Sequence, residues 1–453
     1  MKFSLPLLAA LSLGSLLWCQ IPSPSNLPDA RFKADLLLVV AHPDDESEIG
    51  AFLAKAAFDE HKRIAVVYGT RGNGGGNAIG EEQAASLGAI REIEGRRALG
   101  FLGITNVWFL DGPDTPGQDV LRSLETWNHG RALGKLVRLV RLTRPDVIAT
   151  WLPAYTAGEN HGDHQAAGVL ATEAFDLAGD PTQFPEQVAA PRDPRGISNL
   201  TEGLHPWQAQ KLYYFSDASH FDFLKGKGPQ YSATEISPSK HVAYEILAAR
   251  SCAFHLTQSD SGYAAAKALE NHTVDQTYFH QPSRFVFGKA HVDANVTGDV
   301  FAAIKSDRID YVPPPGYRVT SLSSPTLELG GPWHFYRQFL QAHGMKRLIG
   351  LTPPEVEAGV STRVTVPLLI VNPGSSALHG KISVDLPAGW TQESGADDFE
   401  VQARQTLTKY VIAIAPAKTD AAWKDIKIHA DGDKGAIGQT AVRVRVVQWS
   451  LPQ

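Results

Sequence analysis

The stretch LLLVVAHPDDE, residues 36–46, decides the fold of this chain. Its five aliphatic residues are bounded by polar ones, which predicts a strand buried on both faces in a parallel sheet that helices cover. Open α/β sheets bind their ligands at the carboxyl ends of such strands. One histidine and three acids follow here, so this end of the sheet is the predicted functional edge.

A second polar cluster, NHGDH at residues 160–164, follows another apolar run, Val147 to Trp151. His42 and Asp45 from the first cluster and His164 from the second would supply two imidazoles and a carboxylate. Catalytic zinc sites use such a three-ligand set and keep the fourth position open. The structural alternative is a turn in which Asp45 or Ser47 caps the next helix.

Strand and helix patterns alternate four times between residue 31 and about residue 178. The expected strands are 36–40, 64–68, 107–110 and 147–151, and the expected helices lie near 46–60, 80–100, 119–143 and 164–178. This alternation predicts an α/β fold with a doubly wound, Rossmann-like parallel sheet. In the order 3-2-1-4-5, the commonest for such sheets, strands one and four are neighbours. Since these two strands carry the clusters, topology alone would bring the clusters together.

A glycine-rich loop, GTRGNGGGN at residues 69–77, follows the second strand. It is not a dinucleotide-binding motif, because it lacks the G-x-G-x-x-G spacing and follows strand two rather than strand one. Two interpretations remain. Either this is a flexible loop, or it lies near the metal, where Arg71 presents planar donors to a polar substrate.

Three of these motifs together resemble a known family. AHPDDE at 41–46, the Thr70-Arg71-Gly72 loop and HGDH at 161–164 are similar to motifs of the LmbE-like (PIG-L) family, which includes the GlcNAc-phosphatidylinositol de-N-acetylases. The resemblance covers residues 34–178. It implies an LmbE-like fold and a zinc-dependent hydrolase that removes acetyl groups from N-acetylated amino sugars or cleaves related amides.

The resemblance also implies a role for each motif residue. Zn²⁺, or another divalent ion such as Fe²⁺, would bind His42, Asp45 and His164. The implied catalytic residues are Asp44 as general base, His161 as the transition-state histidine, and Asp163 as the partner that orients His161.

Substrate binding is the role that the resemblance implies for Arg71 and His255. Lys240 and HLTQ at 255–258 resemble a Lys…His-x-Ser/Thr-Gln helix that lies late in the family domain. His161, held by Asp163, is expected to be a cation that stabilises the oxyanion.

The composition excludes some classes of protein. The chain of 453 residues is too long for one core, and a net charge of −6 gives no basic field for nucleic acid. Residues 1–20 have the shape of a bacterial signal peptide, so a secreted or periplasmic protein is expected. Plain secretion and a lipid anchor at Cys19 both remain open, and that anchor would be the only link to a membrane.

The remaining chain is expected to complete two domains. The metal-dependent domain would span 31–348 with insertions; it would contain a fifth strand at 212–215 and helices at 239–258 and 333–348. Phe285–Phe287 and Val300–Ala302 look like strand fragments.

From 355 to 450 the sequence predicts an all-β sandwich, because short alternating segments are separated by turns. They lie at 362–372, 380–385, 406–414 and 441–447. The turn sequences NPG at 372–374 and LPAGW at 386–390 resemble those of the Ig-like modules of secreted bacterial carbohydrate-active proteins. Such a module either binds cell-envelope glycan or only spaces the enzyme.

Two classes of function are therefore compared. One is a metal hydrolase acting on an N-acetylated sugar or, alternatively, on a thiol conjugate or another small amide. The other is a glycan-binding protein without catalysis. The complete polar set favours the enzyme, because a binding protein has no need of a base such as Asp44 beside a metal.

Overall fold

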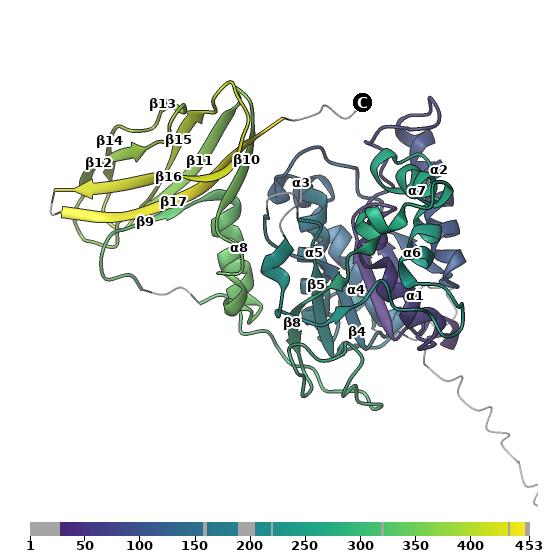
Figure 1. The fold of residues 1–453 in the computed structure, drawn as a ribbon. Coiled ribbons are helices and arrows are strands. Elements are labelled where there is room, and N and C mark those ends of the chain that lie inside the picture. The colour runs from purple at the N-terminus through teal and green to yellow at the C-terminus, as the bar shows by residue number, and fades with distance from the viewer. Residues whose placement is uncertain are drawn as a thin grey trace, which may run out of the picture.

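The computed structural model describes residues 28–156, 161–188, 204–218, 221–318, 321–433 and 435–448. The expected signal peptide and Cys19 lie outside these ranges. The chain forms an α/β lobe and an all-β lobe, with helix α8 between them (Figure 1). In the ranges described, none of the helices combines the length and the apolar character that a membrane crossing requires.

The central sheet of the α/β lobe has the strand order β3-β2-β1-β4-β5-β8. All neighbours are parallel except β5 and β8, which are antiparallel. The predicted order 3-2-1-4-5 is confirmed, and each of the five strands lies within one residue of its expected bounds. The strands are β1 (Leu36–Val40), β2 (Ile64–Tyr68), β3 (Asn106–Phe109), β4 (Val147–Trp151), β5 (Lys211–Phe215) and β8 (Val286–Ala290).

Helices cover this sheet, and every residue of β1, β2, β4 and β5 is buried as a result. The helix expected at 119–143 is two helices, because Asn128 adopts a left-handed conformation with φ of 54°. The helices are α1 (Gly50–Phe58), α2 (Ala84–Phe101), α3 (Val120–Thr126), α4 (His129–Thr143), α5 (Gly162–Leu177), α6 (Tyr244–Cys252) and α7 (Ala264–Glu270). A small hairpin pairs β6 (Gln230–Tyr231) with β7 (Ser283–Arg284).

Two expectations for the later part of this lobe were wrong. The helix expected at 239–258 is shorter, because α6 ends at Cys252 and residues 255–258 form turns whose side chains bind other elements. The fragment Val300–Ala302 is no strand. Its carbonyls instead accept hydrogen bonds from the buried ammonium of Lys211.

The all-β lobe is a sandwich of two sheets around one apolar core. One sheet has the order β10-β17-β16-β12-β14, and the other has the order β13-β15-β11-β9. The strands are β9 (Thr326–Leu329), β10 (Glu355–Gly359), β11 (Arg363–Val371), β12 (Leu378–Asp385), β13 (Thr391–Ser394), β14 (Asp398–Val401), β15 (Thr406–Ile414), β16 (Asp420–Gly432) and β17 (Gly435–Val447). The expected sandwich is present, but its strand β9 precedes the expected boundary at 355 and pairs with β11.

Helix α8 (Gly331–Ala342) joins the two lobes. Trp333 packs against the sandwich core, whereas Tyr336 and Phe339 are part of the α/β core. The Tyr336 hydroxyl also donates a hydrogen bond to Gln165 on α5. The chain therefore passes from the sandwich through the α/β core and back, which fixes the lobes to each other.

A chain that ends at Pro353 is expected to aggregate. It would keep β9 but lose β11, so Leu327 and Leu329, which are 8% and 3% exposed, would lie on an unpaired apolar strand. Size-exclusion chromatography would measure this. In the same shortened chain, the double substitution Leu327→Ser and Leu329→Ser should restore a monomer. A shortened chain that is monomeric without these substitutions would show that β9 needs no partner.

Candidate active site and metal centre

The two polar clusters meet at the carboxyl ends of β1 and β4, as the predicted topology requires. His42 follows β1, Asp45 begins the 3-10 turn Asp45–Ile49, and His164 lies in the first turn of α5. Each of these three residues offers one ligand atom, and these atoms all lie within 4.8 Å of one another.

The donor set fits a zinc ion. Asp45 Oδ1 lies 3.5 Å from His42 Nδ1 and 3.3 Å from His164 Nε2. Tetrahedral zinc with bonds of about 2.0–2.1 Å separates its ligand atoms by roughly 3.3 Å. The Asp45 oxygen therefore already has zinc-ligand spacing to both imidazoles.

The Asp45 carboxylate is oriented by three N–H donors. Its Oδ2 accepts hydrogen bonds from the backbone of Ala41 at 2.8 Å and of His42 at 3.0 Å, and from the indole of Trp151 at 2.7 Å. Its Oδ1 faces the two imidazoles. Burial alone would raise the pKa of Asp45, but His164 and His42 hold it well below its usual range. The carboxylate is thus a fixed anion with one oxygen directed at the metal position.

Trp151, the last residue of β4, also positions His164. The two rings stack with centroids 4.1 Å apart and an interplanar angle of 4°. Helix α5 approaches closely because Gly168 has no side chain: a Cβ there would lie 2.3 Å from the Trp151 carbonyl oxygen. Sequence reasoning took Trp151 only as the end of a strand. Its place at a carboxyl strand end was the available signal.

Asp114 is a site residue that the sequence analysis missed. Its Oδ1 lies 3.1 Å from His42 Nε2, and Asp163 Oδ2 lies 3.5 Å from the same nitrogen. Burial alone would lower the pKa of His42, but Asp45, Asp114 and Asp163 raise it well above its usual value. The site thus concentrates negative charge and favours a cation. Asp114 lies in the loop after β3, so the strand-end rule that found His42 could also have found it.

Asp44 stands beside the ligands but outside their cluster. Its φ of 133° is a region that residues other than glycine rarely adopt. Its Oδ2 accepts a hydrogen bond of 2.5 Å from the Ser261 hydroxyl. Burial and the neighbouring Asp45 carboxylate raise the pKa of Asp44 to about 6. A partly buried carboxylate with this pKa is suited to accept a proton near neutral pH.

A segment far along the chain holds the turn that contains Asp44. His255 Nε2 lies 2.7 Å from Glu46 Oε1, and Gln258 donates to the Pro43 carbonyl. Glu46 Oε2 in turn accepts the backbone N–H of Asp44 at 3.1 Å. Such a clamp can maintain a strained backbone conformation.

Two residues of the expected Lys…His helix do not reach the cavity. His255 is fully buried beside Glu46. Lys240 lies with its ammonium over the ring of Phe58, 4.1 Å from the centroid. The structure therefore gives His255 a positioning contact in place of the expected substrate contact, and the reason is that its imidazole is enclosed by the core.

The substitution His255→Ala is expected to lower the free energy of unfolding by about 3–5 kcal/mol, because it leaves the buried Glu46 carboxylate without its partner. His280→Ala is the matched control, since His280 forms a similar but exposed pair with Glu245 and should cost only about 0–1 kcal/mol. Chemical denaturation of both variants measures the difference. Equal losses would show that the buried pair has no special weight.

His161 differs from its expected charge state. Its Nδ1 lies 3.8 Å from Asp163 Oδ2, which instead accepts the backbone N–H of Thr115 at 2.9 Å. Burial and the imidazoles of His42 and His164 lower the pKa of His161 to about 4. The structure thus favours a neutral imidazole, because desolvation and two neighbouring rings outweigh one carboxylate.

Arg71 does not join the site residues. Its guanidinium pairs with Glu92 at 2.7 Å and Asp111 at 2.5 Å and lies over the ring of Phe109. It is not among the described residues that line the cavity, whereas Arg91 is. Two carboxylates thus engage the guanidinium of the residue for which substrate binding was expected.

Arg91 holds the glycine-rich loop against the cavity. Its guanidinium donates to the carbonyls of Gly72 at 2.6 Å and Gly76 at 2.7 Å, and to the Thr257 hydroxyl at 3.3 Å. Asp114 accepts the Gly74 N–H at 2.8 Å. The loop therefore lines the cavity that contains the candidate ligands, but Arg71, to which the second interpretation gave the substrate contact, pairs with Glu92 and Asp111.

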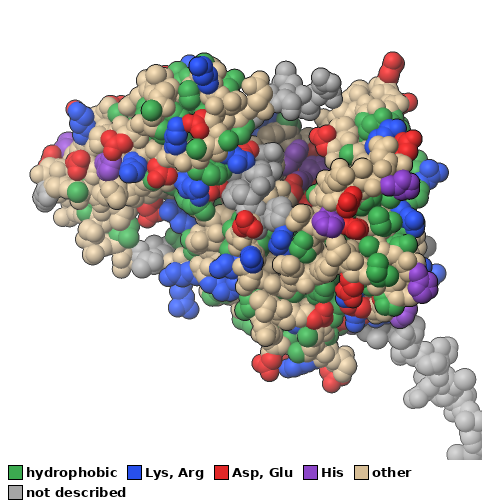
Figure 2. Space-filling view, in the orientation of Figure 1, with side chains coloured by type: hydrophobic (Ala, Val, Ile, Leu, Met, Phe, Trp, Pro, Cys, Tyr) green, Lys and Arg blue, Asp and Glu red, His purple; other side chains and the backbone are tan. Residues whose placement is uncertain are grey.

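One cavity of about 1860 Å³ contains the candidate site. Histidine side chains are visible in the hollow between the lobes (Figure 2). Further acids line this cavity; Glu48 and Asp217 are two of them, and the sequence analysis missed both. Burial and nearby carboxylates raise the pKa of Asp217 to about 6 and that of Glu48 well above its usual value. Asp217 follows β5, so its position after a strand was again the available signal.

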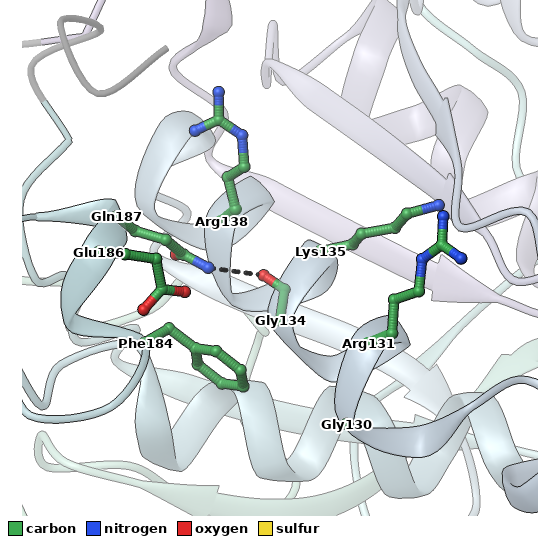
Figure 3. A pocket seen from close by; sticks show the side chains of 8 residues that line it. All are labelled: Gly130, Arg131, Gly134, Lys135, Arg138, Phe184, Glu186 and Gln187. Carbon is green, nitrogen blue, oxygen red and sulfur yellow. Dashed lines mark hydrogen bonds between the residues drawn. The ribbon is translucent and has the colours of Figure 1, made fainter. Parts of the chain in front are cut away.

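A second cavity, of about 420 Å³, lies beside α4 (Figure 3). Arg131, Lys135 and Arg138 extend from this helix, and the Gln187 amide donates to the Gly134 carbonyl at 2.8 Å. The described residues that line it include neither histidine nor any of the candidate ligands. It therefore has no part in the metal centre.

Comparisons with known proteins agree with the motif resemblance. Residues 37–175 match the family model described as PIG-L, GlcNAc-PI de-N-acetylase. A 1D-myo-inositol 2-acetamido-2-deoxy-alpha-D-glucopyranoside deacetylase from Streptomyces avermitilis is 33% identical over 205 residues, which are 42% of this chain and 62% of that protein. The deacetylase of the same name from Streptomyces scabiei is 29% identical over 57% of this chain and 87% of its own length.

A solved structure also matches. It is the N,N'-diacetylchitobiose deacetylase from Pyrococcus horikoshii, with 19% sequence identity and a TM-score of 0.39, covering 56% of this chain and 83% of that one. The chain thus spans less than two thirds of the length of the Streptomyces avermitilis deacetylase. It spans 87% of the Streptomyces scabiei deacetylase and 83% of the Pyrococcus horikoshii deacetylase.

Proposed function

We propose that this protein is a metal-dependent hydrolase that removes the acetyl group from an N-acetylated amino sugar or glycoconjugate. The observation that carries the proposal is one cavity in which the Asp45 carboxylate has zinc-ligand spacing to two imidazoles, with a separate carboxylate, Asp44, beside them. The relatives named as deacetylases of acetamido sugars support the same reaction.

The proposed cofactor is Zn²⁺, held by His42, Asp45 and His164. Such an ion supplies a Lewis acid for the acyl oxygen and lowers the pKa of a water to about 7. The choice of zinc rests on the nitrogen and oxygen donor set, which iron(II) can also use.

Two side chains supply proton transfer and stabilisation of the oxyanion. Asp44 accepts the proton of the attacking water, since its raised pKa of about 6 places its proton affinity near working pH. His161, a neutral imidazole in this geometry, donates a hydrogen bond to the developing oxyanion. The protonated Asp44 can then deliver its proton to the departing amine.

A free-amine and acetate release assay tests the proposal. The purified full chain should release equal amounts of acetate and free amine from N-acetylglucosamine conjugates, lose this activity after chelation, and regain it with Zn²⁺. Release from small amides but from no acetamido sugar would favour the amidase alternative. Binding of glycan without release under zinc would favour the glycan-binding protein.

The location and the sandwich type are part of the proposal as well. The shape of residues 1–20 supports export, with either a free mature chain or a lipid anchor at Cys19. We take the C-terminal sandwich as Ig-like on its two antiparallel-rich sheets around one core. Fractionation and N-terminal sequencing of the mature protein test the first point: a cytoplasmic chain that retains Met1 would exclude export.

A further inference from the structure

The cavity that contains the metal centre does not end within the α/β lobe. Its wall includes Glu357 of β10 and Val447 and Gln448 at the end of β17, all from the sandwich. β10 is the edge strand of its sheet and pairs in parallel with β17. Substrate bound at the metal centre therefore shares one cavity with the sandwich.

The volume of this cavity exceeds the need of a single sugar. Pockets for small ligands typically measure about 300–1000 Å³, and this one measures about 1860 Å³. Polar side chains such as Gln281 and Arg284 line the part contributed by later segments of the α/β lobe. A large cavity whose wall mixes apolar and hydrogen-bonding side chains has room for a chain of sugars, whose rings present both apolar faces and hydroxyl groups.

The sandwich residues that line the cavity are held in place relative to the α/β lobe. Helix α8 packs Trp333 against the sandwich core and Tyr336 against the α/β core. Tyr336 donates to Gln165, whose amide in turn donates to the carbonyl of His161 at 3.3 Å. Glu357 on β10 forms an ion pair with Arg445 on β17, so β10 is also fixed within its own sheet. The distance from the metal centre to this wall is therefore set by packing.

From these observations we infer that the substrate is a chain of several linked N-acetylated amino sugars, and that Val447 and Gln448 of the sandwich form a distal sugar-binding subsite. This inference rests on the proposed function, which it makes more specific. Interactions with sugars remote from the reacting amide would then contribute to transition-state binding. The sandwich would act as part of the substrate site and not only as a spacer.

The experiment compares chain lengths on the full, zinc-loaded protein. The substrates are N,N'-diacetylchitobiose and hexa-N-acetylchitohexaose, and the readouts are kcat/KM and the Kd from isothermal titration. The variant is Gln448→Trp, which fills the exposed wall position. Gln392→Trp is the matched control, because Gln392 is exposed on β13 in the other sheet and does not line the cavity.

The inference expects the hexasaccharide to be preferred by about tenfold or more in kcat/KM, the equivalent of about 1.4 kcal/mol. Gln448→Trp should remove this preference by lowering kcat/KM for the hexasaccharide toward that for the disaccharide. Gln392→Trp should behave as the unchanged protein. Equal kcat/KM for both lengths, or equal behaviour of the two tryptophan variants, would overturn the inference.

Titration separates this inference from the proposed function. If neither sugar is deacetylated but the hexasaccharide binds more tightly and Gln448→Trp weakens that binding, the proposed reaction fails and the subsite stands. If deacetylation occurs without any dependence on length, the reaction stands and the subsite fails. Absence of binding for both sugars would overturn the subsite regardless of activity.

Discussion

Replacing His164 by alanine is expected to remove the metal and to lower kcat/KM by about 10³-fold or more, since a metal supplies several kcal/mol of transition-state stabilisation. His164 Nε2 lies 3.3 Å from Asp45 Oδ1, and its ring is fixed by the stacked Trp151. Two ligands would remain, which is fewer than the three protein ligands of catalytic zinc sites. Elemental analysis should show a fall from about one ion per chain to near zero.

His129→Ala provides the matched control for this prediction. His129 also faces a carboxylate, Glu173 at 2.6 Å, but lies on α4 outside the metal cluster. This variant should keep both the ion and the activity. Full metal content in His164→Ala, or equal loss in both variants, would contradict the assignment of His164 as a ligand.

The second large effect is expected for Asp44→Asn, which should retain the metal and lower kcat by about 10²–10⁴-fold, the usual range for a lost general acid or base. Asparagine keeps the size of the side chain and an oxygen that can accept the Ser261 hydrogen bond. It also tolerates positive φ better than most residues, which the φ of 133° requires. Only the ability to take up a proton is removed.

Paired measurements of kcat and metal content on the same preparation decide this prediction. Ser261→Ala is the comparison variant, because it removes the hydrogen bond to Asp44 and leaves the carboxylate in place. It should lower kcat by far less than Asp44→Asn. If Asp44→Asn releases the ion, Asp44 is a ligand; if kcat changes only a few-fold, another group is the base.

The strand-end rule explains which parts of the site could be predicted. The aliphatic runs 36–40 and 147–151 are buried strands, and their neighbouring positions in the sheet bring His42 and His164 together. The same rule covers Asp114 and Asp217, but neither stands in a dense cluster of histidines and acids: Asp114 shares its loop only with Asp111 and Asp119. One acid at such a position is too common to stand out from the many loop acids.

Arg71 and His255 show where motif similarity was not enough. Both occupy motif positions, yet the partners that they bind are distant in sequence: Glu92 and Asp111 for the first, Glu46 for the second. Which carboxylate a basic side chain meets depends on helix placement and burial. The spacing of residues within a motif gives no information about helix placement or burial.

The sequence by itself determined the parallel sheet, its strand order, the presence of a sandwich and the meeting of His42, Asp45 and His164, because hydrophobic periodicity and strand-end position are local properties that one-dimensional spacing records. Only the tertiary structure decided the strained turn at Asp44, the surroundings that lower the pKa of His161, and the sandwich wall at Gln448. These depend on contacts between segments far apart in the chain. Desolvation and packing at such contacts arise only when the whole chain is folded.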